Sequence, residues 1–182
     1  LKEIYFHLYP NAFKAQSIAP FPKDEMGLAY PDGFSPGYMD ILGVKVRNKE
    51  TRFDIDGINM KVSLPGELMP GRSTSITINF MVKLPPSDGR FGYGKNTIRL
   101  ANWYPIVSMY GKDGWNKDPY YATGDPFYSE TAKYTVRLTA PSEYSVASTG
   151  TAKTEENKTN KMWYINADKV RDMAVVLSDK FK

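Results

Sequence analysis

The sequence feature that most constrains the fold is the lack of a sustained helical repeat. No segment keeps apolar residues at helical spacing for three turns, whereas many short segments alternate apolar and polar residues with a period of two. Turn residues separate these segments about every 8–12 residues. The pattern predicts an all-β fold, a β-sandwich or saddle-like curved sheets of short, mostly antiparallel strands with long loops. The segment 73–84 is the longest example, and one of its faces carries Ile76, Ile78, Phe80 and Val82.

Further strands are expected along the whole chain. Residues 52–64 form two alternating runs that meet at Asp56-Gly57, and Asp-Gly suits the positive φ angles of a type I′ hairpin turn. Residues 153–161 are so polar that we expect them to form the tip of a second hairpin. Residues 85–96 contain three glycines and predict a loop. The other predicted strands are 1–10, 38–47, 133–140, 144–148, 162–166 and 173–177.

The bulk properties of the chain predict one β domain over residues 1–182, with no linker, repeat or low-complexity segment. The chain begins at Leu1 inside a predicted strand, which indicates a piece of a longer protein. With no cysteine, it has neither disulfides nor Cys-type zinc sites. Its net charge of +4 comes from interspersed basic and acidic residues, so nucleic acid is a poor candidate partner. No apolar run approaches the roughly 20 residues of a membrane-spanning helix.

Catalytic chemistry finds little support in the residues themselves. His7 is the only histidine, so an HExxH zinc motif cannot be present. It lies in the middle of a predicted strand and no Gly-x-Ser-x-Gly elbow accompanies it, which argues against a Ser-His-Asp triad. We interpret His7 as a structural or surface residue. The sequence therefore assigns no catalytic residue and no metal ligand to this chain.

Four carboxylates share one predicted loop, and they leave one alternative open. Such groups can bind calcium or act as an acid–base pair. Their spacing does not fit an EF-hand, and acidic residues in a loop usually serve to keep it solvated. Whether the loop from Asp113 to Asp125 binds an ion is left undecided at this point. The four residues are Asp113, Asp118, Asp125 and Glu130.

The stretch from Arg99 to Glu130 is the most aromatic part of the chain. Its glycines and prolines prevent one long helix or strand, so a short strand feeding an ordered, aromatic-packed loop is expected. Ordered loops on a rigid scaffold often carry recognition residues. Aromatic side chains that merely plug the end of a β core are the alternative. The aromatic residues are Trp103, Tyr104, Tyr110, Trp115, Tyr120, Tyr121, Phe127 and Tyr128.

The same stretch resembles a known family. The order and spacing of several motifs are similar to the N-terminal β domain of M1 zinc metallopeptidases (aminopeptidase N and leukotriene A4 hydrolase-like), in a bacterial branch. The likeness extends over essentially all 182 residues. The motifs are LYPNAF at 8–13, LMPGRSTSITINFMVKLP at 68–85, RFGYG at 90–94, NWYP at 102–105, Gly114-Trp115, YSVASTG at 144–150 and VRDMAVVL at 170–177.

The resemblance implies a non-catalytic domain of a longer peptidase. In that family the domain packs on a thermolysin-like catalytic domain, which holds zinc through HExxH and a downstream Glu, and it closes one wall of the cleft. A short Gln-x-Glu-Pro segment anchors the free amine of the peptide substrate. Asn102 falls at the Gln position and Tyr104 replaces the acidic residue of many members. The resemblance thus makes Asn102, Trp103 and Tyr104 substrate-binding candidates, with zinc expected only in the catalytic domain.

Other interpretations remain at this point. Trp103 and Tyr104 could serve only as core and wall residues. The aromatic loop also fits a carbohydrate- or surface-binding β-sandwich, which would need coplanar exposed rings at Trp103, Trp115 and Tyr121. Buried rings beside an apolar patch would favour the peptidase domain instead. A scaffold role, as in relatives that have lost catalysis, is the third interpretation.

Overall fold

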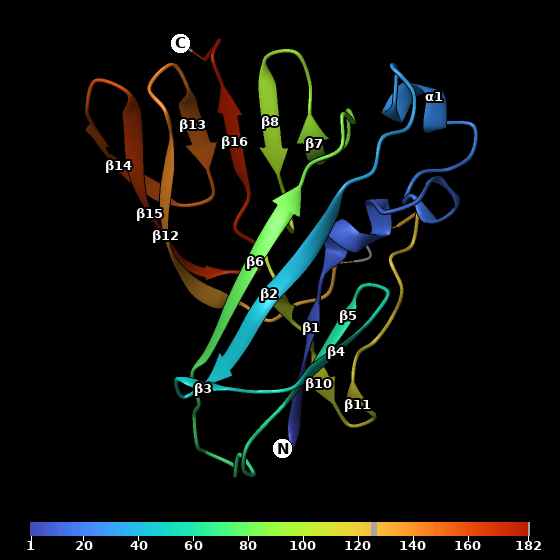
Figure 1. The fold of residues 1–182 in the computed structure, drawn as a ribbon, viewed down its shortest axis with the longest axis vertical. Helices are drawn as coiled ribbons and strands as arrows, with labels where there is room; N and C mark the ends of the chain where they lie inside the picture. The colour runs from blue at the N-terminus through green and yellow to red at the C-terminus, as the bar shows by residue number, and fades with distance from the viewer. Residues whose placement is uncertain (125–126, 182) are drawn as a thin grey trace.

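The computed structural model of the chain describes residues 1–124 and 127–181, which are built mainly from strands and loops (Figure 1). The predicted all-β class is confirmed. No helix in these two ranges is long and apolar enough to cross a membrane. The helical elements there are short: η1 (Tyr9–Phe13), η2 (Gln16–Ile18) and α1 (Met26–Ala29).

Two antiparallel sheets pack face to face in the lower part of Figure 1, and we call them the N-terminal sandwich. The predicted alternation holds in the longest strand of this pair, where every second residue faces the core. One sheet has the order β4-β5-β1-β9, with β4 (Phe53–Asp56), β5 (Asn59–Ser63), β1 (Glu3–His7) and β9 (Ile106–Val107). The other has the order β3-β2-β6, with β3 (Lys49–Glu50), β2 (Tyr38–Val46) and β6 (Ile76–Lys83).

Two further antiparallel sheets form the C-terminal sandwich at the upper left of Figure 1. Its core contains Trp163, Ile165 and Met173, all nearly inaccessible to solvent. One sheet has the order β13-β16-β8-β7, with β13 (Ser145–Ser148), β16 (Val175–Ser178), β8 (Thr97–Leu100) and β7 (Phe91–Tyr93). The other has the order β12-β15-β14, with β12 (Ala132–Pro141), β15 (Asn160–Val170) and β14 (Thr151–Glu156).

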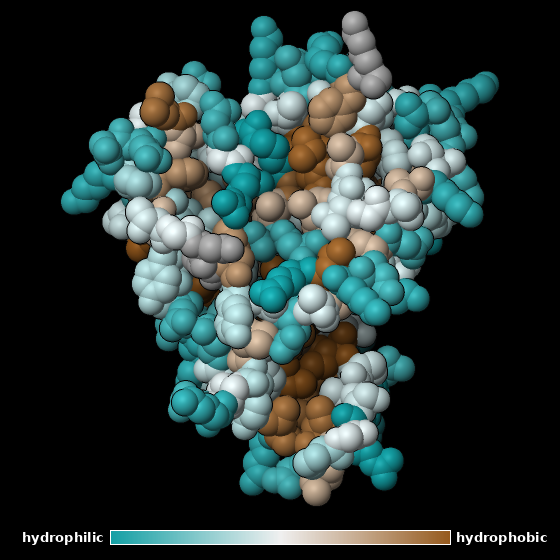
Figure 2. Space-filling view, turned by 180° about the vertical axis from the view of Figure 1, so that it is seen from behind, coloured by the Kyte–Doolittle hydropathy of each residue, from teal (hydrophilic) through white to brown (hydrophobic). Residues whose placement is uncertain are grey.

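A third, aromatic cluster is distinct from both sandwich cores, and we call it the junction core. On the rear face, Figure 2 shows one apolar area in the upper half and another in the lower half, with a largely hydrophilic band between them. The junction core draws its residues from η1, β7, β9 and the loops around them. Its buried members are Tyr9, Ala12, Phe13, Ile58, Phe91 and Ile106, and Phe21, Trp103, Tyr104, Tyr120 and Phe127 pack against them.

The predicted hairpin at residues 52–64 is confirmed, but its turn type is not I′. Asp56 pairs with Asn59, so the two loop residues are Gly57 and Ile58. Only Gly57 has a positive φ, 56°, because a β-branched side chain such as that of Ile58 disfavours this region. A glycine at the first loop position suits a type II′ turn.

The expected hairpin tip at residues 153–161 is wrong in extent. Most of this polar segment belongs to the paired strands β14 and β15, and the turn between them is only 157–159. Every residue of β14 is exposed, because this strand is an edge of its sheet, and an edge strand tolerates charged residues. Asn157 closes the turn, since its Oδ1 accepts the backbone N–H groups of Thr159 (3.0 Å) and Asn160 (2.9 Å).

Part of the predicted loop 85–96 is also a strand. β7 lies inside it and pairs with β8. Gly92 makes this pairing compatible with the neighbouring loop: its φ is 155°, and a Cβ there would come within 2.6 Å of the carbonyl oxygen of Ser87. Sequence patterns mark Gly92 as a residue that interrupts a strand, but in the structure it lies within a strand where two backbone segments approach closely.

Candidate functional site

The central segment contains several short strands where one short strand leading into a loop was predicted. After β8 the chain turns through residues 101–105 into β9, then forms the small hairpin of β10 (Tyr110–Gly111) and β11 (Gly114–Trp115). Residues 116–124 and 127–131 contain no strand. This path carries the segment from the C-terminal sandwich across the junction core to the open face of the β4-β5-β1-β9 sheet.

Asn102 lies at the junction core. Its side chain is buried, with 5% exposure, and its φ is 52°, a left-handed conformation that asparagine tolerates better than most residues. It borders a narrow hollow that is too small to hold a water molecule. The predicted candidate therefore lies in an aromatic-walled recess. The other lining residues are Tyr9, Pro10, Phe13, Arg90, Phe91, Ala101, Tyr120 and Phe127.

Trp103 and Tyr104 attach the same turn to the C-terminal sandwich. Trp103 Nε1–H donates to the backbone oxygen of Met173 at 3.0 Å. The Tyr104 hydroxyl lies 3.1 Å from Asp172 Oδ1 and 3.0 Å from the Tyr134 hydroxyl, and it accepts the Met173 N–H at 3.3 Å. We call these five residues the latch. Both aromatic side chains have their polar tips engaged within the chain.

The environment of Tyr104 keeps its hydroxyl neutral. Burial raises the pKa of this phenol well above its usual range, and the hydrogen bond with Tyr134 and the charge of Asp172 raise it further. A phenol held in this state provides hydrogen bonds but no acid–base step near neutral pH. In this chain the Tyr104 side chain is a structural tie between the turn that carries Asn102 and residues 172–173.

His7 is buried beneath the start of the loop that follows β11. Only 2% of it is exposed, and its ring stacks on Tyr9 with 5.0 Å between centroids. Burial lowers the pKa of the imidazole, while a hydrogen bond with the Asn59 side chain and the charge of Asp118 oppose that change. Its Nδ1 atom has no hydrogen-bond partner of good geometry. His7 is therefore a buried residue of the N-terminal sandwich.

Among the described residues, the carboxylates of the central loop do not gather into one site. Asp113 is exposed at the β10–β11 turn, whereas Asp118 accepts a hydrogen bond from the Asn116 side chain at 2.8 Å. Glu130 is exposed further along, and Asp125 lies outside the described residues. Over residues 1–124 and 127–181, no group of three or more His, Asp or Glu side chains is placed to hold a metal ion.

The aromatic rings do not form the flat platform that a sugar-binding face would need. Trp115 meets Tyr110 edge-on, with 4.9 Å between centroids and 67° between planes, and lies tilted against Tyr5. Trp103 is half-buried and tied to Met173, and Tyr121 is exposed. Trp103 and Trp115 are thus only partly exposed, whereas the carbohydrate interpretation expected exposed rings at both.

The sequence did not single out Arg90, which lines the recess, or Arg99, which holds the loop that precedes Arg90. Arg90 lines the hollow and places its guanidinium 4.9 Å from the centre of the Phe127 ring. Arg99 holds the loop at residues 87–89, which precedes Arg90. Its Nε donates to the Gly89 oxygen at 2.9 Å, and a terminal guanidinium nitrogen donates to the Ser87 oxygen. The RFGYG motif marked this neighbourhood, but the contacts join loops that only the fold brings together.

Comparison with solved structures identifies the architecture. An M1 zinc metallopeptidase from Deinococcus radiodurans matches with a TM-score of 0.55 and 15% identity, over 98% of this chain and 34% of that one. The fold of this chain is that of part of an M1 zinc metallopeptidase. A mutant two-domain M1 zinc metallopeptidase bound to L-arginine matches with a TM-score of 0.51 and 12% identity, over 98% of this chain and 34% of that one.

A Deinococcus radiodurans M1 mutant bound to a Tyr-Ser-Ala substrate also matches, with a TM-score of 0.50 and 15% identity, over 97% of this chain and 34% of that one. The chain thus spans about a third of the length of the M1 structures it matches. The sequence matches no protein-family model and no curated protein sequence. At these identities the M1 likeness concerns the fold alone.

Proposed function

We propose that this chain is the non-catalytic N-terminal β domain of an M1-type, aminopeptidase-like zinc metallopeptidase. It shapes one wall of the active-site cleft and holds the amino-terminal end of the peptide while another domain cuts. The observation that carries this proposal is the match of nearly the whole chain to about a third of each M1 metallopeptidase chain. One of those M1 structures holds a peptide, which fits a peptide substrate.

The proposed peptide contact is the recess beside Asn102. We expect the free amine of the peptide to reach the amide oxygen of Asn102 there; because the recess is too narrow to hold a water molecule in this conformation, its aromatic walls must part to admit the amine. Arg90 lines the same hollow and its charge repels an ammonium group, so we expect the first carbonyl oxygen of the peptide on that side. Trp103 and Tyr104 contribute by holding the turn in place.

Zinc and the hydrolytic water belong, in this proposal, to a thermolysin-like catalytic domain of the same parent protein. Zinc there polarises the scissile carbonyl group and activates water. In this proposal the present domain supplies no ligand to that metal. The parent reading frame is expected to encode HExxH and a downstream Glu.

The experiment is the kinetics of Asn102→Ala in the full-length parent enzyme. Loss of a contact made equally in the ground state and the transition state raises KM and leaves kcat nearly unchanged. We expect about a tenfold rise in KM for short peptides with a free amine, as follows from losing roughly 1–2 kcal/mol of hydrogen bonding. Asn79→Ala, an exposed site on β6, is the matched control.

The amine dependence sharpens the assignment. Asn102→Ala should affect peptides with a free amine more than the same peptides with an acetylated amine. Unchanged KM for both substrates would remove Asn102 from the peptide site. An equal loss for both would assign Asn102 to the peptide backbone instead of the amine.

A further inference from the structure

His7 lies at the centre of a row of groups on the open face of the β4-β5-β1-β9 sheet. It pairs across the sheet with Asn59 on one side and Ile106 on the other. Above it lies the Tyr9 ring. His7 Nδ1 and Asn59 Oδ1 are both inaccessible to solvent, and the contact between the two side chains does not meet the geometry of a good hydrogen bond. Groups of this kind are costly to bury and gain most from contact with water.

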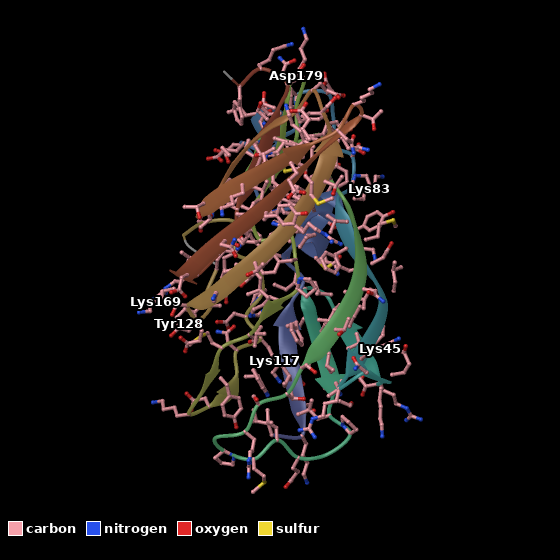
Figure 3. The ribbon with its side chains drawn as sticks, turned by 90° about the vertical axis from the view of Figure 1, so that its left-hand side faces the viewer. Lys45, Lys83, Lys117, Tyr128, Lys169 and Asp179 are labelled. Atoms are coloured by element: carbon pink, nitrogen blue, oxygen red, sulfur yellow. The ribbon has the colours of Figure 1, made fainter. Side chains whose placement is uncertain are left out.

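Residues 116–120 cover this row, and we call them the cover. Its exposed members Lys117, Asp118 and Pro119 contribute no apolar core contact. A few hydrogen bonds hold it in place: the Asn59 side chain donates to the Lys117 oxygen at 3.1 Å, and the Asn116 N–H donates to Met109 at 2.8 Å. Figure 3 shows Lys117 beside β1, where its ammonium lies 5.2 Å from the centre of the Tyr5 ring.

The cover ends at a wall of the recess. Tyr120 meets Tyr9 edge-on at 5.9 Å and Phe13 at 6.1 Å, and it lines the hollow beside Asn102. Tyr9 is also the ring on which His7 stacks. The imidazole and the hollow thus share one ring, Tyr9, and one segment, the cover.

We propose that His7 makes the recess sensitive to acid: a proton taken up by the buried imidazole releases the cover and displaces Tyr120 from the wall of the hollow. The movement of the cover is inferred from the contacts among His7, the cover and Tyr9. Its consequence for a bound peptide rests on the proposed function of the recess.

The charges around His7 set the direction of this response. Asn59 faces the imidazole from β5, Tyr9 from η1 and Asp118 from the cover, while β9 presents the non-titrating Ile106. Asp118 attracts an imidazolium, but burial is the larger influence and disfavours it. When the cover opens, water reaches the ring and its pKa returns to the ordinary value of 6.5. Acid below that value therefore favours the open form.

The test is amide hydrogen exchange together with the NMR titration of the single imidazole. In the wild-type chain, protection factors of amides in residues 109–120 should fall by up to about tenfold per pH unit below pH 6.5. The fall should be absent in His7→Gln, while amides of β15 stay protected in both proteins. A wild-type chain with pH-independent protection in the cover, or a His7→Gln chain with the same fall, would overturn the proposal.

A second pair of variants tests the proposal if His7→Gln does not fold. Asp118→Asn removes the charge that favours the imidazolium, so the imidazole should titrate at lower pH and the loss of protection should extend further into acid. Asp113→Asn, on the adjacent hairpin and away from His7, should leave both unchanged. Equal behaviour of the two variants would also overturn the proposal.

Peptide affinity separates the two claims. If the recess binds peptide, the affinity of the chain for Tyr-Ser-Ala should fall several-fold between pH 7.5 and 5.5 in wild type and stay constant in His7→Gln. A cover that opens in acid while Tyr120 and Asn102 keep their NMR signals would overturn the link between His7 and the hollow. Displacement of Tyr120 without any change in peptide affinity would support the switch and count against the proposed peptide site.

Discussion

The latch and the cover hold the junction core in opposite ways. In the latch, Trp103 and Tyr104 bond to the turn at 172–173, and each polar tip has a partner within the chain. The cover is exposed and lies over two buried polar atoms of His7 and Asn59 that lack good partners. Fully satisfied buried networks resist opening more than a buried pair whose hydrogen bond is poorly formed. The comparison assigns a fixed side and a movable side to the recess at Asn102.

The largest effect should come from emptying the core behind the latch. Met173 is fully buried and its carbonyl oxygen receives the Trp103 N–H. We expect Met173→Ala to lower the free energy of unfolding by about 2–5 kcal/mol, because it leaves a cavity in the C-terminal sandwich. Urea unfolding measures it, and Met69→Ala, at an exposed site, is the control. A loss below about 1 kcal/mol would show that the fixed side is not rigid.

A smaller effect should follow from removing one latch hydroxyl. In Tyr104→Phe the Met173 N–H keeps its bond to Asp172 Oδ1 at 2.8 Å, so the latch is weakened and not broken. We expect the free energy of unfolding to fall by about 1–2 kcal/mol. Tyr110→Phe, at an exposed hydroxyl, should change it by less than about 0.5 kcal/mol. Equal losses in the two variants would contradict the special status of the latch.

The third effect should be the pH dependence at the cover, which changes stability only below pH 6.5. Folding lowers the pKa of His7, so below pH 6.5 the unfolded chain binds more protons than the folded one. The stability contributed by the neutral imidazole is present above pH 6.5 and is lost as the pH falls toward the lowered pKa, at up to about 1.4 kcal/mol per pH unit. Urea unfolding between pH 5 and 8 should show this slope in wild type, and a flatter one in His7→Gln. Parallel slopes would assign the dependence to other groups.

The sequence predicted strands best where alternation was long. The segment containing Ile76, Ile78, Phe80 and Val82 forms β6 as expected, because period two places a whole face in the core. Polarity misled the prediction at 153–156, since an exposed edge strand such as β14 needs no apolar face. Residues 52–64 form the predicted hairpin, but its turn is not type I′. Asp56 pairs with Asn59, so Ile58 occupies the second loop position, where a type I′ turn needs a positive φ.

The candidate site was predictable only in part. The NWYP motif pointed to Asn102, and the structure places that residue at a recess. The roles of Trp103 and Tyr104 in the latch depend on residues 172 and 173, about 70 positions away, and no local pattern encodes such a contact. The same holds for His7, whose burial beneath the cover comes from the crossing of the central segment over β1.

The measurement that tests the central claim most directly uses the isolated chain, its zinc content, its peptidase activity and its NMR response to Tyr-Ser-Ala. The account predicts no stoichiometric zinc, no hydrolysis, and signal changes centred on Asn102 that weaken when the peptide amine is acetylated. Tight zinc binding with unaided cleavage, or signal changes confined to residues far from the recess, would contradict the claim that this domain holds a peptide for a catalytic neighbour.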